Sequence, residues 1–146
     1  MDLNDIYTEV ILEHSRNSRN KKELSNPTFV EPGNNPSCGD EITLQLKGNE
    51  DKIEDASYTG TGCAISQAST SIMIDTIKNH SYKEALDMAN DFIGMIKNEV
   101  TDQEEFDKLG DAIIFENIKN LPARVKCAVL PWYTLKNVIE KNNKDK

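Results

Sequence analysis

The feature that most constrains the fold is a change in the period of the apolar residues near the middle of the chain. Over residues 42–46, isoleucine and leucine alternate with polar residues, as in a half-buried strand, and residues 48–50 supply a turn. A second strand follows over residues 53–58, where the alternation slips by one position near Asp55, as a β-bulge would cause. A two-stranded hairpin with one apolar side is not stable alone. This hairpin must therefore rest on helices.

Helical spacing on both sides of the hairpin supplies that support. Residues 3–17 carry apolar side chains three and four positions apart, and the small residues of 64–72 allow a helix to pack closely on the sheet. Residues 81–84 have the form of a capping box that opens another helix, and Pro122 suits the first position of the last one. We expect an α+β fold in which a small antiparallel sheet, the hairpin plus a possible short third strand, packs against a layer of helices.

Two longer segments have weaker patterns. Residues 15–36 are polar and rich in asparagine and proline, so we expect a connecting loop that delivers Cys38 to the fold. Residues 97–120 are acidic and partly helical in pattern; such charged runs are commonly solvated faces. We interpret 97–120 as an appended surface insertion that contacts a partner. We expect one domain over residues 1–142, followed by a flexible tail at 143–146.

Composition limits the location and the ligands. The 25 acidic residues outnumber the 17 lysines and arginines, and the net charge of −8 argues against a nucleic-acid partner. No apolar run approaches the roughly 20 residues that span a bilayer, so no membrane association is expected. Three cysteines form an odd and sparse set, and the N-terminus lacks the pattern of a secretory signal. We therefore expect a reducing, cytoplasmic setting in which the thiols serve chemistry or packing.

Cys38 and Asp40 stand two positions apart across Gly39. Side chains at this spacing leave an extended backbone on the same face, so a sulfur and a carboxylate can point at one atom. Gly39 removes the side chain that would crowd this atom. These residues suggest half of a metal site. Taken alone, they are more simply explained by a surface turn in which Asp40 caps backbone amides.

The other two cysteines stand at helix positions. Cys63 lies near the first turn of a helix, where unpaired amides favour a thiolate; a small buried cysteine is the equal alternative. Cys127 lies in the last helix, and Pro131 removes the amide that would bond to its carbonyl, so we expect a kink or a restart there. His14 is more simply a packed residue than a ligand, and His80 a helix-end residue.

Together these groups make three thiols and one carboxylate, which is the number of anionic ligands that a tetrahedral zinc requires. Their spacing does not establish that they converge, because 24 residues lie between the first two cysteines and 63 between the last two. The local sequences around them are more informative. These are NPSCGD at 35–40, GTGCAIS at 60–66 and LPARVKC at 121–127.

In this order around a hairpin, the three motifs resemble the IscU/NifU-like family of iron–sulfur assembly proteins, and more closely its SufU branch. IscU-type members carry a histidine directly before the third cysteine, where this chain has Lys126, which cannot ligate a metal while protonated. SufU-type members carry an insertion between the second and third cysteines, where this chain has residues 97–120. Members usually have a small residue where Pro131 stands, so the helix geometry beside Cys127 departs from the family pattern.

The resemblance implies a zinc-dependent sulfur carrier, a sulfurtransferase-type acceptor in iron–sulfur cluster assembly. Zinc would be held by Cys38, Asp40, Cys63 and Cys127. A SufS-type, pyridoxal-phosphate-dependent cysteine desulfurase would pass persulfide sulfur to Cys38, a histidine of the desulfurase replacing Cys38 on zinc. Arg124 would stabilise the displaced thiolate, or would simply pair with a surface acid. The onward acceptor would be a SufBCD-type assembly complex.

Two other functions are compatible with the same residues. An IscU-type scaffold would assemble a transient iron–sulfur cluster on Cys38, Cys63 and Cys127, with Asp40 as a fourth ligand. A zinc-stabilised adaptor would use the same ligands without sulfur chemistry.

Overall fold

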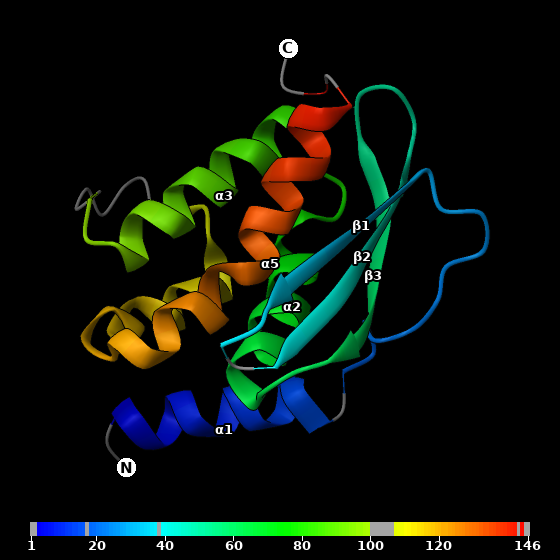
Figure 1. Cartoon of the computed structure of the whole chain (residues 1–146). Coiled ribbons are helices and arrows are strands. Elements are labelled where there is room, and N and C mark those ends of the chain that lie inside the picture. The colour runs from blue at the N-terminus through cyan, green and yellow to red at the C-terminus, as the bar shows by residue number, and fades with distance from the viewer. Residues whose placement is uncertain (1–2, 17, 38, 100–106, 143, 145–146) are drawn as a thin grey trace.

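The computed structural model describes residues 3–16, 18–37, 39–99, 107–142 and 144 (Figure 1). Strands β1, β2 and β3 form one antiparallel sheet in that order, and the described helices are α1, α2, α3 and α5 together with the 3₁₀ helix η1. The predicted α+β class is confirmed. The bounds are β1 Phe29–Asn35, β2 Asp40–Gly48, β3 Ile53–Thr61, α1 Leu3–Arg16, α2 Ala64–Ile77, α3 Tyr82–Ile96, η1 Gly110–Asn120 and α5 Pro122–Lys141.

The helices cover one face of the sheet. α2 and α5 lie directly on the strands, whereas most of α3 and η1 packs on the side of α2 and α5 away from the sheet (Figure 1). The first residue of α3, Tyr82, reaches the sheet, where its ring meets the edge of Phe29. α1 is held against α2. The residues of β2 that alternate in the sequence, Ile42, Leu44 and Leu46, are buried on the face that meets the helices. The alternation in the sequence thus corresponds to the core face of the sheet.

The predicted hairpin and its bulge are confirmed. β2 and β3 pair antiparallel, and their register shifts between the pair Lys47↔Asp55 and the pair Gly48↔Ile53. The slip in alternation near Asp55 is this irregularity. The capping box of α3 is also present, because Ser81 and Glu84 exchange side-chain to backbone hydrogen bonds. α2 begins directly after Cys63, and α5 begins at Pro122, as predicted.

The expectation that residues 15–36 form only a connecting loop is wrong, because β1 occupies Phe29–Asn35 and pairs with β2 along its whole length. β1 is an edge strand, where proline is tolerated because one side of the backbone needs no ladder bond. Gly33 has a packing role, since a Cβ there would overlap the Thr134 hydroxyl of α5. Contact with α5, rather than local propensity, therefore specifies this strand.

The interpretation of 97–120 as a surface insertion is corrected for its described part, which adds buried side chains to the core. Leu109, Ala112 and Phe115 have no exposed surface, and the Phe115 ring meets the edge of Phe92 at 6.0 Å between centroids. Phe106, an apolar residue of the same segment, lies outside the described residues. The acidic side chains of η1 face outward while its apolar ones complete the core.

The sequence predicted either a kink or a restart at Pro131. α5 is one helix from Pro122 to Lys141, so it does not restart there, and its ribbon changes direction partway along (Figure 1). Of the apolar stripe predicted for α1, Val10 and Ile11 pack against the core, and the side chains of residues 3–8 lie outside the described part. In the predicted tail, the Lys144 ammonium donates to the Glu50 carbonyl at 2.9 Å. Within the described chain, no helix combines the length and apolarity needed to cross a membrane.

Candidate metal centre

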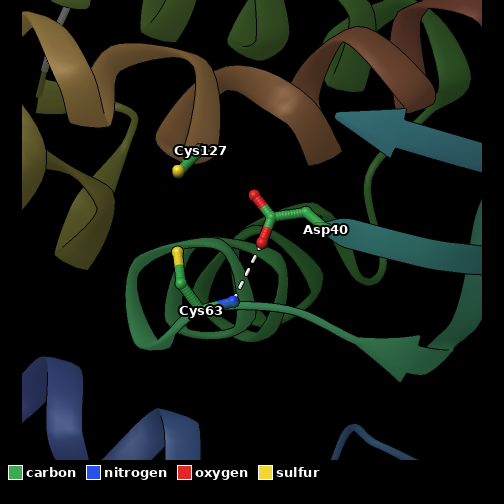
Figure 2. Close-up of side chains that lie close together, drawn as sticks. All are labelled: Asp40, Cys63 and Cys127. Carbon is green, nitrogen blue, oxygen red and sulfur yellow. Dashed lines mark hydrogen bonds between the residues drawn. The ribbon is translucent and has the colours of Figure 1, made fainter. Parts of the chain in front are cut away.

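Three of the four predicted ligands meet at one end of the sheet. Asp40 is the first residue of β2, Cys63 directly precedes α2, and Cys127 lies in the second turn of α5. One ligand atom from each side chain lies within 4.8 Å of the other two (Figure 2). Cys38, the fourth predicted ligand, lies outside the described residues. Side chains from three separate elements thus converge as the motifs predicted.

Cys63 is placed by the junction between β3 and α2. It is the N-cap of α2 with extended backbone angles (φ −70°, ψ 168°), and its sulfur accepts a hydrogen bond from the Ser66 N–H at 3.5 Å. The Ser66 hydroxyl donates in turn to the Cys63 carbonyl at 3.1 Å. The sulfur therefore sits at the positive end of the helix dipole. Gly62 is needed beside it, because a Cβ there would overlap the Ser66 hydroxyl and stand 2.8 Å from Asp40 Oδ1.

Asp40 is a fully buried carboxylate with one satisfied oxygen. Its Oδ1 accepts from the Cys63 N–H at 2.9 Å, and its Oδ2 has no hydrogen-bond partner. Leaving a buried polar atom unpaired costs about 1–3 kcal/mol, and more for a charged group. The unpaired oxygen lies on the side of Asp40 that faces Cys127 in Figure 2. This arrangement suits a carboxylate that shares a cation with the two sulfurs.

Cys127 is buried and is positioned through contacts between α5 and α2. The Ser69 hydroxyl of α2 donates to the carbonyl of Ala128 at 2.6 Å, next to Cys127, and accepts from the Trp132 indole N–H at 3.0 Å. The Trp132 ring stacks on Phe92 with centroids 4.3 Å apart. These buried contacts fix the position of α5 along α2, so that Cys127 faces Cys63.

The donor set fits zinc. Thiolates and a carboxylate are ligands that Zn²⁺ prefers, and bonds of about 2.0–2.3 Å place the ligand atoms of a tetrahedral site about 3.3–3.8 Å apart. The ligand atoms of Asp40, Cys63 and Cys127 lie within 4.8 Å of one another, and small side-chain rotations would bring them to the shorter distances of a zinc site. The unpaired Asp40 Oδ2 is an acceptor that a cation would satisfy. The described residues supply three ligands, so a fourth ligand is still required.

Arg124 and Lys126 lie at the rim of this centre. Both are exposed, and they line a cavity of about 530 Å³ together with Ser37, Pro122 and Ala123. Within the described residues, neither side chain forms an ion pair. Arg124 is therefore not engaged by a described surface acid, the alternative role that the sequence left open. Lys126 also lines a groove of about 370 Å³ between β1 and α5.

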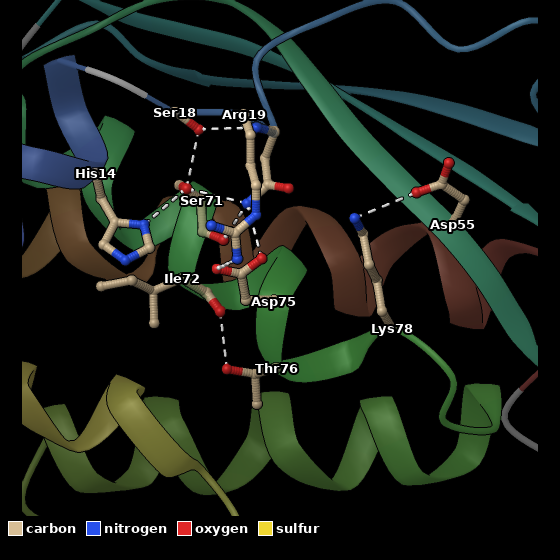
Figure 3. A network of polar contacts seen from close by, with 10 residues as sticks. His14, Ser18, Arg19, Asp55, Ser71, Ile72, Asp75, Thr76 and Lys78 are labelled. Carbon is tan, nitrogen blue, oxygen red and sulfur yellow. Dashed lines mark hydrogen bonds and ion pairs between the residues drawn. The ribbon is translucent and has the colours of Figure 1, made fainter.

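The two histidines lie away from the centre. The His14 Nδ1 is 2.9 Å from the Ser71 hydroxyl, which also receives hydrogen bonds from Ser18 and Asn20 (Figure 3). His14 thus packs α1 against α2, which confirms the simpler of its two interpretations. His80 is 3.5 Å from the Glu84 carboxylate at the start of α3.

The residues that sequence reasoning missed are those that support the ligands. Gly62, Ser66, Ser69 and Asn35 surround the three ligands without contributing one of the predicted groups. The glycines of the GTGC motif were a usable signal for a close approach, since Gly62 lies against Asp40. Asn35 belongs to the NPSCGD motif, but its position beside Asp40 could not be predicted, because it depends on the pairing of β1 with β2.

Comparison with known proteins gives a consistent result. The family model described as "NifU-like N terminal domain" matches residues 6–137. The chain is 39% identical to the "Iron-sulfur cluster assembly scaffold protein IscU" of Thermotoga maritima over 136 residues, covering 93% of this chain and 94% of that protein. It is 40% identical to the "Zinc-dependent sulfurtransferase SufU" of Bacillus subtilis over 140 residues, covering 96% of this chain and 93% of that protein.

Solved structures agree with the fold. A crystal structure from Fervidobacterium islandicum, described as a scaffold protein for the SUF system, is 41% identical with a TM-score of 0.86 and covers 93% of this chain and 98% of its own. A NifU-like protein from Brucella abortus, at 23% identity with a TM-score of 0.80 and 99% of both chains covered, shows the same fold. The chain therefore belongs to the NifU-like N-terminal domain family, which its IscU and SufU relatives share.

Proposed function

We propose that this protein is a zinc-binding sulfur carrier in iron–sulfur cluster assembly. It accepts sulfur on Cys38 from the persulfide of a SufS-type cysteine desulfurase and passes it to a SufBCD-type assembly complex. Zinc is held by Asp40, Cys63 and Cys127, with Cys38 as the exchangeable fourth ligand. The proposal makes the chain a sulfurtransferase-type acceptor that acts with the desulfurase.

The observation that carries this proposal is the group formed by Asp40, Cys63 and Cys127 around an unpaired buried carboxylate oxygen. The position next to Cys127, where IscU-type members carry a histidine, is occupied by Lys126, which cannot bind a metal while protonated. Lys126 is exposed, and a protonated lysine has no lone pair to offer a metal. The name of the Bacillus subtilis relative, a zinc-dependent sulfurtransferase, supports zinc as the metal.

The transfer step is a thiolate–persulfide exchange. The Cys38 thiolate attacks the outer sulfur of the donor's cysteine persulfide, the S–S bond breaks, and the donor cysteine leaves as a thiolate. Cys38 becomes the persulfide, and no external oxidant or reductant is needed. Zinc, when bound, keeps its sulfur ligands deprotonated. Arg124 at the rim supplies a positive charge beside the sulfur after it leaves the metal.

A second function deserves a test because several relatives, two of them among the most similar, carry its name. The Thermotoga maritima and Streptococcus pyogenes proteins, 39% and 37% identical, are both named cluster assembly scaffolds. In this alternative the three cysteines and Asp40 hold a transient iron–sulfur cluster. Metal analysis of protein purified under reducing conditions separates the two. Colourless protein with one tightly held zinc supports the carrier, and a brown chromophore with iron and sulfide supports the scaffold.

Sulfur transfer is tested with Cys38→Ala and the desulfurase. The variant is expected to abolish the rise in cysteine turnover that the wild-type protein causes, while Ser37→Ala, a change in the adjacent exposed residue, is expected to preserve it. Full stimulation by Cys38→Ala would show that Cys38 is not the acceptor. A fold check by circular dichroism accompanies both variants.

The ligand set is tested separately with Asp40→Ala. Loss of a buried charged ligand is expected to weaken zinc binding, measured by competition with a chromophoric chelator. Unchanged affinity would remove Asp40 from the set.

A further inference from the structure

Asn35 is the last residue of β1 and the direct cross-strand partner of Asp40. Side chains of directly opposed residues leave an antiparallel pair on the same face, with Cβ atoms about 4.5–5.5 Å apart. Gly33 is on the same face as Asn35, and a Cβ there would overlap Thr134 of α5, so this face is the one that meets α5. Its side chain therefore lies beside the carboxylate that forms part of the candidate metal centre.

The side chain of Asn35 is buried and lacks a partner. It is 7% exposed, and its Nδ2 is a buried donor without a hydrogen bond, while Asp40 Oδ2 is a buried acceptor without one. Each unpaired group costs about 1–3 kcal/mol. These two atoms belong to directly opposed residues of one strand pair, so the donor of Asn35 can bond to the acceptor of Asp40. The proposed cation would satisfy Asp40 Oδ2, but it would leave the Asn35 Nδ2 donor without a partner.

We propose that Asn35 is a positioning residue of the metal centre, whose amide donates a hydrogen bond to the Asp40 carboxylate in the zinc-loaded protein. This inference rests on the proposed function, because it assumes that Asp40 binds zinc. The Cys63 N–H already fixes Asp40 Oδ1 at 2.9 Å. A donor to Oδ2 would fix the second oxygen, so that the carboxylate is held at both atoms.

The geometry leaves room for this contact to form. An asparagine turns its amide by rotation about two bonds, and the groove of about 370 Å³ beside Asn35 gives the amide space to turn. Hydrogen bonds to a ligating carboxylate orient the ligand, and their removal typically lowers metal affinity about 10- to 100-fold. The same range is expected here.

Asn35→Leu distinguishes this role from a structural one. Leucine has a similar size and no polar atom, so replacing an unpaired buried amide leaves the zinc-free protein as stable as wild type or more stable. If Asn35 orients Asp40, the same variant weakens zinc binding. A residue that merely packs would instead lower both properties or neither. Asn34→Leu is the matched control, because Asn34 is adjacent and exposed and pairs with the exposed Glu41.

The experiment measures the zinc dissociation constant by chelator competition and the urea stability of the zinc-free protein. Asn35→Leu is expected to raise the dissociation constant about 10- to 100-fold with stability unchanged or increased. Asn34→Leu is expected to leave the dissociation constant within about twofold, since it touches no ligand. An unchanged dissociation constant in Asn35→Leu would overturn the inference while leaving the proposed function intact. Failure of the wild-type protein to bind zinc would overturn both.

A double-mutant cycle identifies the ligand through which Asn35 acts. In the background of Asp40→Ala, the change Asn35→Leu is expected to have no further effect on zinc affinity, because the acceptor is gone. Additive effects would overturn the assignment to Asp40. If Asn35→Leu does not fold, Asn35→Ala takes its place in the cycle, where the coupling decides the outcome.

Discussion

Gly62→Ala tests how tightly the carboxylate of Asp40 is confined. A Cβ at this position would stand 2.8 Å from Asp40 Oδ1, about 0.6 Å closer than ordinary contact at 3.4 Å, and would also overlap the Ser66 hydroxyl. Asp40 Oδ1 is the atom that accepts from the Cys63 N–H at 2.9 Å. Displacement of the oxygen by that distance stretches this hydrogen bond to about 3.5 Å, the limit at which such a bond exists.

The size of the effect follows from this lost bond. A hydrogen bond to a charged group contributes about 1.5–3 kcal/mol, so the free energy of unfolding of the zinc-free protein is expected to fall by that amount. The same bond orients a proposed zinc ligand, so zinc affinity is expected to fall about 10- to 100-fold. Both effects arise although Gly62 itself contributes no ligand.

Two measurements check this prediction. Urea unfolding gives the stability of the zinc-free protein, and chelator competition gives the zinc dissociation constant. In the background of Asp40→Ala, Gly62→Ala is expected to lower zinc affinity less than it does in the wild-type protein, because the contact with the Asp40 carboxylate is gone and the contact with Ser66 remains. A zinc dissociation constant within twofold of wild type for Gly62→Ala alone would refute the reasoning.

Two further predictions concern stability. Phe115→Ala is expected to cost about 3–5 kcal/mol in urea unfolding, since Phe115 has no exposed surface and packs on Phe92. Asn117→Ala, on the exposed side of η1, is the control and should lower the free energy of unfolding by less than about 0.5 kcal/mol. If Phe115→Ala lowered it by no more than Asn117→Ala, η1 would not be part of the core. Burial of Asp55 by itself raises its pKa, but the hydrogen bond from the Ala56 N–H and the positive charge of Lys78 outweigh burial and hold the pKa below its ordinary value of 3.8. A carboxyl group whose pKa is lower in the folded than in the unfolded state stabilises the protein at pH values above the unfolded-state pKa, and this stabilisation is lost as the pH falls through the folded-state pKa. Lys78→Met should therefore lower the free energy of unfolding by up to about 1 kcal/mol at pH 7 and by progressively less below pH 3.8. Urea titrations at each pH measure this difference.

The helices and the central hairpin could be predicted because their signals are local. A period of two over residues 42–46, a slip near Asp55, a capping box at 81–84 and a proline at the start of α5 each describe a few neighbouring residues. The candidate ligands were also visible in the sequence, since a thiol or a carboxylate beside glycine is recognisable from its neighbours.

β1 could not be predicted from local signals. Its sequence contains Pro32 and Gly33, which normally argue against a strand, and the pairing with β2 is stabilised by the packing of Gly33 on Thr134 of α5. The side chain of Asn35 gains its position beside Asp40 only from that pairing. In the same way, the acidic composition of 107–120 favoured a surface insertion, although Leu109, Ala112 and Phe115 of this segment are part of the core.

By itself, the sequence determined the type and order of most elements and the chemical identity of the groups that can bind a metal. Only the tertiary structure decided that Asp40, Cys63 and Cys127 meet, because their approach depends on the buried contacts of Ser69 and Trp132 between α2 and α5. Such contacts join residues that are about sixty positions apart, and no periodicity in a short segment encodes them. Short sequence motifs therefore identify the side chains that can bind a metal, whereas the packing of the core brings these side chains together.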